Sequence, residues 1–263
     1  MLVESTPCGL THIKYHTPCR SCPLKMADMI PWLEGNDDFP PPERALTEPN
    51  GLLAASTDLS AKRLLAAYQC GIFPWYSDDQ PVLWWSPDPR MVLFPAEFRM
   101  PRSLAKRLRR GDYEIRIDTS FESVMRACAA PRGPDAGTWI TPAMIAAYGE
   151  LHRLGHAHSV ETWINDRLVG GLYGVALGCV FYGESMFAAA PDASKIALAH
   201  LVQHLHRSNF GLIDCQMNTA HLARFGAREI PRSEFSQHLA ELVNYPSSAD
   251  VWRFGSNILT MPW

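Results

Sequence analysis

The chain has 263 residues, enough for one large domain or two modest ones, and its 47% hydrophobic and 19% charged residues are ordinary for a globular protein. The formal net charge of −3 argues against a general polyanion binder, so any nucleic-acid contact must come from a local basic patch. No apolar run approaches the roughly 20 residues of a membrane span, and no secretory signal is evident. We therefore expect a cytoplasmic protein without a membrane contact.

The N-terminal segment contains three of the seven cysteines, at Cys8, Cys19 and Cys22. A single C-x-x-C pair is a weak zinc signal, although His12 and His16 could complete a site. We expect residues 1–28 to be a flexible extension, with translation starting at Met26 or Met29 as one explanation, and we expect no bound metal.

Residues 29–96 are expected to form a small, irregular N-terminal domain. Proline is frequent in this segment, which argues against regular interior strands. One helix is expected in "STDLSAKRLLAAYQCG", residues 56–71, with Ser56 or Thr57 as its N-cap.

Residues 97–263 have the pattern of an α+β domain with a mostly antiparallel sheet. Three closely spaced strands joined by turn residues indicate an antiparallel meander. The expected helices span 100–111, 120–130, 141–155, 192–209, 219–226 and 232–243, and the expected strands span 113–118, 156–164, 167–177, 179–187 and 211–218.

The strand "GLIDCQMN", residues 211–218, contains two polar side chains in an apolar run. Side chains alternate along a strand, so Asp214 and Gln216 should point to the same face. Asp214 could cap a turn while Gln216 binds backbone, which is a purely structural arrangement. Alternatively, the carboxylate polarises the amide, and the amide oxygen accepts a proton or orients a nucleophile.

Two other features have both a structural and a functional interpretation. Glu184 in "FYGESMF" lies among apolar residues, as either a site residue or a salt-bridge partner. On the expected helix 100–111, four basic side chains share one face without interleaved acids, which is either a solvated surface or a phosphate-binding surface. They are Arg102, Lys106, Arg109 and Arg110.

Aromatic and histidine residues also suggest candidate sites. Trp75 and Trp139 lie in loops, where a tryptophan can stack on a base, although most tryptophans belong to the core. Two H-x3-H-x-H sets begin at His152 and His200. We expect these histidines to lie on the surface rather than to bind zinc.

Taken together, the sequence motifs of this chain resemble those of the leucyl/phenylalanyl-tRNA–protein transferases of bacteria. The resemblance covers residues 30–235, most of the chain. It is carried by the blocks "PNGLLA", "DLS", "GIFPWYS", "LWWSPDPR", "GTWI", "LHRLGHAHSVE", "LVGGLYGVALG", "GESMF", "DASKIAL", "LIDCQ" and "FGAREIPR".

The resemblance implies an acetyltransferase-like (GNAT) domain at residues 97–263 and a specific reaction. Such enzymes move leucine or phenylalanine, and less readily methionine, from aminoacyl-tRNA to proteins that begin with Arg or Lys. This marks the acceptors for degradation by the N-degron route. The reaction needs neither a metal nor another cofactor, and we expect a monomer.

The resemblance also implies roles for single residues. Asp214 polarises the Gln216 amide, whose oxygen draws a proton from the attacking amine, and Glu184 holds the acceptor's ammonium or its cationic first side chain. The four basic residues contact the tRNA acceptor stem, and Trp75 and Trp139 lie near the terminal adenosine and the acceptor peptide. The donor side-chain pocket is formed by Leu172, Phe181, Met186, Leu201 and Leu205.

Two alternatives remain from other functional classes. An acyl-CoA-dependent N-acetyltransferase on the same fold would need a glycine-containing pyrophosphate loop, and the corresponding "AAAPDASK" has no glycine. A non-catalytic tRNA- or peptide-binding module would keep the basic helix face without requiring Asp214 and Gln216 together.

Overall fold

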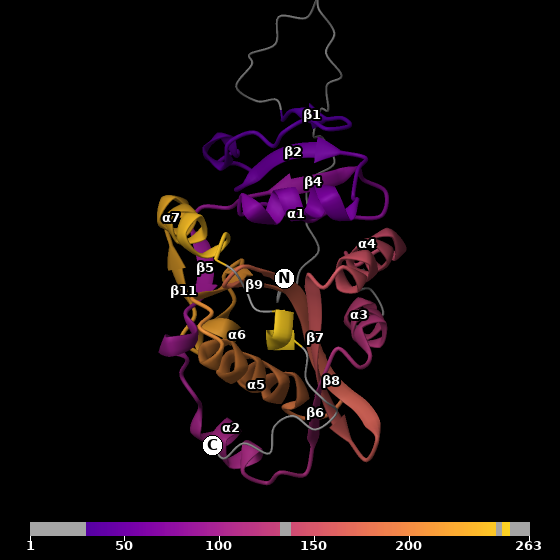
Figure 1. Ribbon diagram of the computed structural model, residues 1–263, viewed down its shortest axis with the longest axis vertical. Helices are drawn as coiled ribbons and strands as arrows, with labels where there is room; N and C mark the ends of the chain where they lie inside the picture. The colour runs from indigo at the N-terminus through magenta and orange to yellow at the C-terminus, as the bar shows by residue number, and fades with distance from the viewer. Residues whose placement is uncertain (1–29, 132–137, 246–248, 253–263) are drawn as a thin grey trace, which may run out of the picture.

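The computed structural model describes residues 30–131, 138–245 and 249–252, which form two β-sheets with helices packed against them (Figure 1). The expected extension at residues 1–28, with its cysteines and histidines, lies outside the described residues. Among the residues described, no helix combines the length and the apolar character that crossing a bilayer requires.

The first sheet is built from residues before position 86 and has the strand order β1-β2-β4-β3. Its strands are β1 (Trp32–Leu33), β2 (Leu52–Ser56), β3 (Phe73–Pro74) and β4 (Val82–Trp85). The expectation that proline would exclude regular interior strands here is wrong. The segments of β2 and β4 contain no proline and are fully buried, while Pro74 occupies an edge strand, where a missing N–H is tolerated.

The second sheet has seven strands in the order β11-β5-β10-β9-β8-β7-β6. These are β5 (Arg90–Leu93), β6 (Glu114–Ile117), β7 (Ala157–Ile164), β8 (Arg167–Leu177), β9 (Val180–Ala188), β10 (Leu212–Gln216) and β11 (Arg228–Ile230). Strands β9 and β10 run parallel, and the other neighbours run antiparallel. The predicted α+β class with a mostly antiparallel sheet is confirmed. The domain boundaries expected at 28/29 and 96/97 stay predictions, and β5 before the second of them belongs to this sheet.

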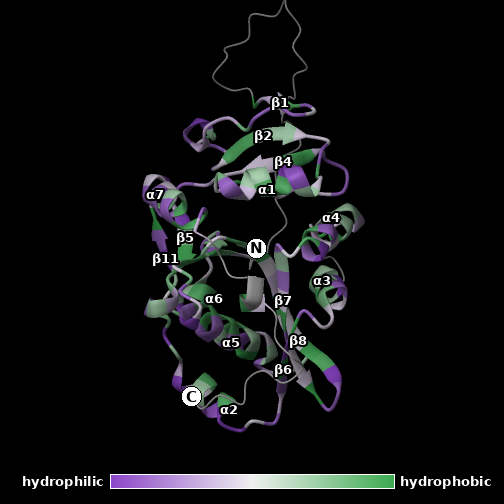
Figure 2. Ribbon diagram, in the orientation of Figure 1, coloured by the Kyte–Doolittle hydropathy of each residue, from purple (hydrophilic) through white to green (hydrophobic). Residues whose placement is uncertain are grey.

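Helices cover both faces of the seven-stranded sheet (Figure 1). The α-helices are α1 (Ala61–Gln69), α2 (Arg102–Leu108), α3 (Phe121–Ala129), α4 (Pro142–Arg153), α5 (Ala193–Arg207), α6 (Ala220–Ala223) and α7 (Arg232–Leu242), and short 3-10 helices span Pro42–Arg44, Pro95–Glu97 and Ala249–Trp252. One core cluster joins α1, α3, α4 and the first sheet, and another joins α5 to the opposite face of the second sheet. Figure 2 shows the hydrophobic residues along β2, β4 and β8 that these clusters bury.

Helix α1 begins later than expected. Ser60 is its N-cap, and the Ser60 hydroxyl accepts a hydrogen bond from the Arg63 backbone N–H at 3.3 Å. Ser56 cannot serve because it ends β2, where its hydroxyl accepts from Trp84 Nε1 at 2.9 Å. Tyr68 lies on the buried side of this helix with Leu64 and Ala67, and its side chain is fully buried.

Candidate active site

Two register shifts shape the centre of the seven-stranded sheet. Tyr173 of β8 pairs with Ser185 and the next residue pairs with Gly183, which leaves Glu184 as an extra residue in β9. A second shift, between β10 and β5, leaves Cys215 without a partner beside Gln216. Such bulges re-aim side chains and are common next to active sites. Here they bring Gln216 Nε2 to 3.0 Å from Glu184 Oε1.

Glu184 is a buried carboxylate held by uncharged donors. Its side chain is 1% exposed, and it accepts hydrogen bonds from Tyr68 at 2.7 Å, from Tyr148 at 3.1 Å and from Gln216. None of these described partners carries a positive charge. Tyr182, two residues earlier in β9, donates its hydroxyl to the Tyr68 carbonyl at 2.7 Å, which ties α1 to the same strand.

Burial dominates the protonation chemistry around Glu184. It raises the pKa of the Glu184 carboxyl above its usual value, although hydrogen bonds from Tyr68 and Tyr148 act in the opposite direction. Burial and the nearby Glu184 charge also raise the pKa of Tyr68 and of Tyr148 well above the ordinary tyrosine value. Both hydroxyls therefore stay protonated at neutral pH and remain hydrogen-bond donors.

Gln216 ends β10 in an unusual backbone conformation. Its φ of +64° lies in the left-handed region, which costs a residue other than glycine about 1–2 kcal/mol. The side chain is buried, and its carbonyl oxygen Oε1 has no hydrogen-bond partner among the described residues. A buried, unpartnered carbonyl oxygen is a ready acceptor for a substrate N–H.

Asp214 pairs with an arginine rather than with the Gln216 side chain. Its carboxylate accepts from Arg90 Nε at 2.8 Å and from Arg90 Nη2 at 2.7 Å, and from the Gln216 backbone N–H at 2.9 Å. The predicted shared face of Asp214 and Gln216 is found, since Ile213 and Cys215 pack in the core cluster on the other side. The expected contact of Asp214 with the Gln216 side-chain amide is wrong, because that amide is turned to Glu184.

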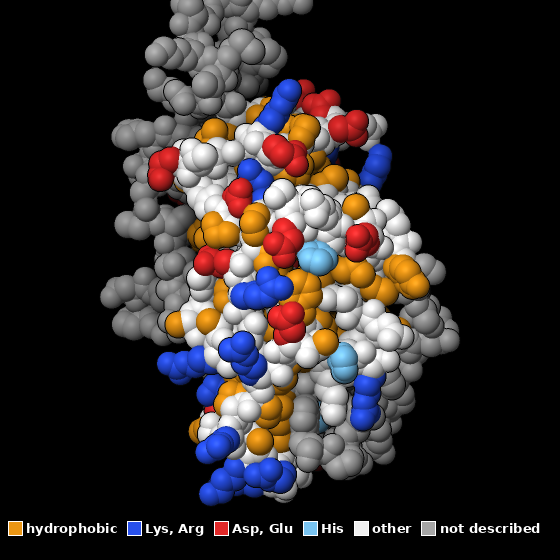
Figure 3. Space-filling view, turned by 90° about the vertical axis from the view of Figure 1, so that its left-hand side faces the viewer, with side chains coloured by type: hydrophobic (Ala, Val, Ile, Leu, Met, Phe, Trp, Pro, Cys, Tyr) orange, Lys and Arg blue, Asp and Glu red, His pale blue; other side chains and the backbone are white. Residues whose placement is uncertain are grey.

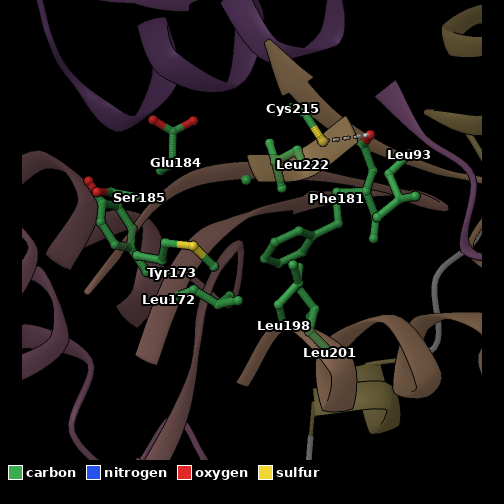
Figure 4. A pocket seen from close by; sticks show the side chains of 13 residues that line it. Leu93, Leu172, Tyr173, Phe181, Glu184, Ser185, Leu198, Leu201, Cys215 and Leu222 are labelled. Carbon is green, nitrogen blue, oxygen red and sulfur yellow. Dashed lines mark hydrogen bonds between the residues drawn. The ribbon is translucent and has the colours of Figure 1, made fainter. Parts of the chain in front are cut away.

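An apolar pocket lies beside Glu184, with about 20 Å³ of free space. Four residues of the predicted donor pocket line it, namely Leu172, Phe181, Met186 and Leu201. Figure 4 shows Glu184 and Ser185 at one end and Leu198 and Leu201 at the other. The fifth predicted residue, Leu205, is buried in the same core cluster but does not line the pocket.

Neither predicted tryptophan lines this pocket. Trp75 is half-buried and packs against Trp85 with ring centroids 5.6 Å apart. Trp139 is half-buried against the core cluster of the first sheet and α4. Their predicted contacts with adenosine and peptide stay predictions.

The four predicted basic residues are all exposed on or just after α2. Leu104 and Leu108 form the buried side of this helix. Figure 3 shows lysine and arginine side chains gathered at the lower end of the molecule, where α2 lies in Figure 1. We call this set, Arg102, Lys106, Arg109 and Arg110, the α2 basic face.

The expectation of surface histidines holds for His206, which is exposed, but not for half of the two sets. His158, His200 and His204 are buried, and His158 Nδ1 is 2.7 Å from Asp118 Oδ2. Within the described ranges, no group of three potential ligands lies close enough together to hold a metal ion.

Three site residues were not anticipated from the sequence. Tyr68 and Tyr148 lie on helices whose apolar faces gave no reason to separate them from ordinary core residues. Arg90 follows two closely spaced prolines, and its one distinguishing signal is a charge at the start of the apolar run "RMVL".

Comparisons with known proteins identify the family. The model described as "Leucyl/phenylalanyl-tRNA protein transferase" matches residues 92–240, and the model of its N-terminal domain matches residues 57–88. The leucyl/phenylalanyl-tRNA–protein transferase of Nitrosospira multiformis is 63% identical over 226 residues, covering 86% of this chain and 97% of its own length. The same enzyme of Laribacter hongkongensis is 59% identical with the same coverage.

The chain belongs to the leucyl/phenylalanyl-tRNA protein transferase family. The resemblance deduced from the sequence is thereby confirmed, and so is the expected enzyme class, an aminoacyltransferase. Among solved structures, L-PGS from Bacillus licheniformis is similar at 10% identity and a TM-score of 0.35, covering 64% of this chain and 54% of its own.

Proposed function

We propose that this transferase moves leucine or phenylalanine, and less readily methionine, from aminoacyl-tRNA to the α-amine of proteins that begin with Arg or Lys. The transfer marks these acceptors for degradation by the N-degron route. The observations that support the proposal most directly are the apolar pocket, which Glu184 helps to line, and the buried Glu184 carboxylate, whose oxygens are turned toward Tyr68, Tyr148 and Gln216. An apolar donor side chain suits the pocket, and an ammonium group suits the carboxylate.

The reaction needs positioning and proton removal. The acceptor nitrogen attacks the carbonyl carbon of the aminoacyl ester, a peptide bond forms, and the bond from that carbon to the ribose oxygen breaks. The α-ammonium, with a pKa of about 7.7–8.0, loses two protons in all: one goes to solvent before the attack, and the other goes to the released ribose oxygen. Because the ester is already activated, the step needs neither ATP nor coenzyme A.

Glu184 receives the acceptor's ammonium in this proposal. The carboxylate has three donors but no cationic partner among the described residues, so a substrate ammonium would complete its charge pair. Burial strengthens such a pair because the local dielectric constant is low.

Gln216 orients the attacking amine. Its Oε1 is buried and lacks a partner in the described part of the chain, so it can accept an N–H of the amine. An amide is a weak base, and we assign it orientation rather than proton storage. Orientation of two reactants supplies several kcal/mol of barrier reduction.

The decisive experiment incubates the protein with radiolabelled Phe-tRNA or Leu-tRNA and a peptide that begins with Arg. We expect label in the peptide without ATP or coenzyme A. The same peptide with an acetylated N-terminus is the control and should stay unlabelled. Absence of label over a range of salt concentrations contradicts the proposal, and a requirement for acyl-CoA supports the acetyltransferase alternative.

Donor preference should depend on Leu201. The pocket holds about 20 Å³ of free space, so a donor side chain must displace lining groups such as the flexible Met186. Leu201→Ala enlarges the pocket and should raise the ratio of kcat/KM for Phe-tRNA over Leu-tRNA by about tenfold or more, since one group's difference is worth about 1–3 kcal/mol. The matched control is Leu205→Ala, which leaves a similar void in the same core without reaching the pocket. An equal change in both variants contradicts the pocket assignment.

The α2 basic face is proposed to bind the tRNA acceptor stem. Arg109→Ala with Arg110→Ala should weaken tRNA binding and reduce the slope of log Kd against log salt by about 1–2, because each phosphate contact contributes about 0.7–0.9. The control replaces two exposed arginines that are ion-paired elsewhere, Arg126 and Arg153. An unchanged slope in the first variant removes this face from the tRNA footprint.

A further inference from the structure

The Arg90–Asp214 pair is isolated from solvent. Both side chains are 0% exposed, and two parallel hydrogen bonds of 2.8 Å and 2.7 Å join them. The remaining guanidinium nitrogen of Arg90, Nη1, has no hydrogen-bond partner among the described residues. Within the described part of the chain, Asp214 is therefore the one residue that the Arg90 side chain hydrogen-bonds. Two-point pairing fixes the orientation of a carboxylate in a way that a single lysine cannot.

Arg90 is itself held between two aromatic rings. Its guanidinium carbon lies 4.7 Å from the ring centroid of Phe73 in β3 and 4.7 Å from that of Phe235 in α7. The two rings hold the guanidinium from both sides. Through its hydrogen bonds to Asp214, Arg90 therefore links β3 of the first sheet and helix α7 to strand β10.

The carboxylate of this pair also holds the active-site backbone. Asp214 Oδ1 accepts the Gln216 N–H at 2.9 Å, and Gln216 is the residue with the unfavourable φ of +64°. A side-chain oxygen that binds the N–H two residues ahead stabilises such a turn. Without Arg90, the buried carboxylate would lose its counter-charge and its orientation.

We infer that Arg90 is a positioning residue for the transfer reaction. Through Asp214 it fixes the Gln216 backbone, and it thereby aims the Gln216 side chain at the attacking amine. The inference rests on the proposed function for its kinetic consequence, and on the contacts of the Arg90–Asp214 pair for its structural part.

A double-mutant cycle tests the kinetic part, with Arg90→Gln, Asp214→Asn and the two combined. Each single variant should lower kcat by about 100-fold, because small misplacements of reacting groups have effects of that size. KM for Phe-tRNA and for the peptide should change less than about threefold. The combined variant should also lose about 100-fold rather than the product of about 10,000-fold, since both residues act as one unit. A loss equal to the product overturns the inference.

Arg90→Lys is a second, milder variant for the case that Arg90→Gln does not fold. It keeps the buried positive charge but loses the two-point contact, and its kcat should fall by about tenfold. The melting temperature of each variant shows whether the kinetic loss is confined to folded protein. A kcat of Arg90→Lys equal to that of the unaltered enzyme overturns the inference.

Hydrogen exchange provides a readout that does not need activity. The Gln216 backbone amide is bonded and buried, so it should exchange at least about tenfold faster in Arg90→Gln, while amides of residues 172–176 in β8 stay unchanged. A lower kcat with unaltered Gln216 exchange overturns the positioning role. If the unaltered protein transfers no amino acid, the proposed function fails, and the exchange result alone decides whether Arg90 holds Gln216.

Discussion

Gln216→Met is expected to lower kcat by about 100-fold or more, while the Kd for Phe-tRNA changes less than about twofold. Methionine fills the same volume but offers neither the unpartnered Oε1 to the attacking amine nor the donor to Glu184. Single-turnover transfer to an Arg-peptide and a separate tRNA-binding assay measure the two quantities.

The control for this prediction is Gln237→Met, the same chemical change at an exposed position of α7. It should leave both quantities unchanged. If tRNA binding is lost together with the rate in Gln216→Met, the glutamine supports the local structure, and the proposed role in orienting the amine is wrong.

Glu184→Gln is expected to lower kcat/KM by about 100- to 1,000-fold without lowering the melting temperature. The carboxylate is buried without a cationic partner among the described residues, so its charge opposes folding even as it prepares the site for an ammonium group. Removing the charge should therefore keep or raise stability, and a gain of about 1 kcal/mol corresponds to roughly 2–4 °C in Tm for a chain of this size. Steady-state kinetics and calorimetry on the same sample make the comparison.

The matched control is Glu161→Gln. Glu161 is also fully buried, but each of its oxygens faces a group that can only donate a hydrogen bond. Oε1 accepts from the Ser120 backbone N–H, and Oε2 accepts from Trp163 Nε1. In Glu161→Gln the side-chain NH2, itself a donor, must face one of these two donors, which leaves both groups unpaired in the core. The variant should therefore have a Tm lower by several degrees, while its folded protein keeps the kcat of the unaltered enzyme. A drop in Tm of equal size in Glu184→Gln would contradict the view that the Glu184 charge opposes folding.

The stability difference between Glu184→Gln and the unaltered enzyme should also depend on pH. Burial raises the pKa of Glu184 above the ordinary value near 4.5, so the folded protein holds this proton more tightly than the unfolded chain does. The free energy of unfolding then falls as pH rises through the raised pKa. The advantage of Glu184→Gln should grow over that same range and level off above it, which urea titrations at several pH values can measure.

Local patterns predicted the secondary structure of residues 97–263 well. The six helices, the three strands of the meander and two further strands have clear apolar periodicity or turn residues, and they appear as α2–α7 and β6–β10; of the described strands in this segment, only the three-residue β11 was not predicted. The first sheet was missed because its strands have only two to five residues and are separated by proline-rich turns. Sheet pairing, not periodicity, defines such short strands.

The site was only partly predictable, because its contacts join distant parts of the chain. Tyr68 and Glu184 are 116 residues apart, and Arg90 and Asp214 are 124 apart. No sequence spacing indicates such pairs. The register shifts that turn Glu184 toward Gln216 are equally invisible, because each depends on the facing strand. The sequence identified the polar residues of β9 and β10 but not the partners that hold them.

Helix α1 and strand β9 are joined by two hydrogen bonds of opposite direction, from Tyr182 to the Tyr68 carbonyl and from the Tyr68 hydroxyl to Glu184. The segment that contains the first sheet and α1 therefore cannot be exchanged for that of a homologous enzyme without regard to β9. We expect an active chimera only where the exchanged helix has a tyrosine at the position of Tyr68, within reach of Glu184. Substitutions on α1 and on β9 therefore have to remain compatible with each other at these two contacts.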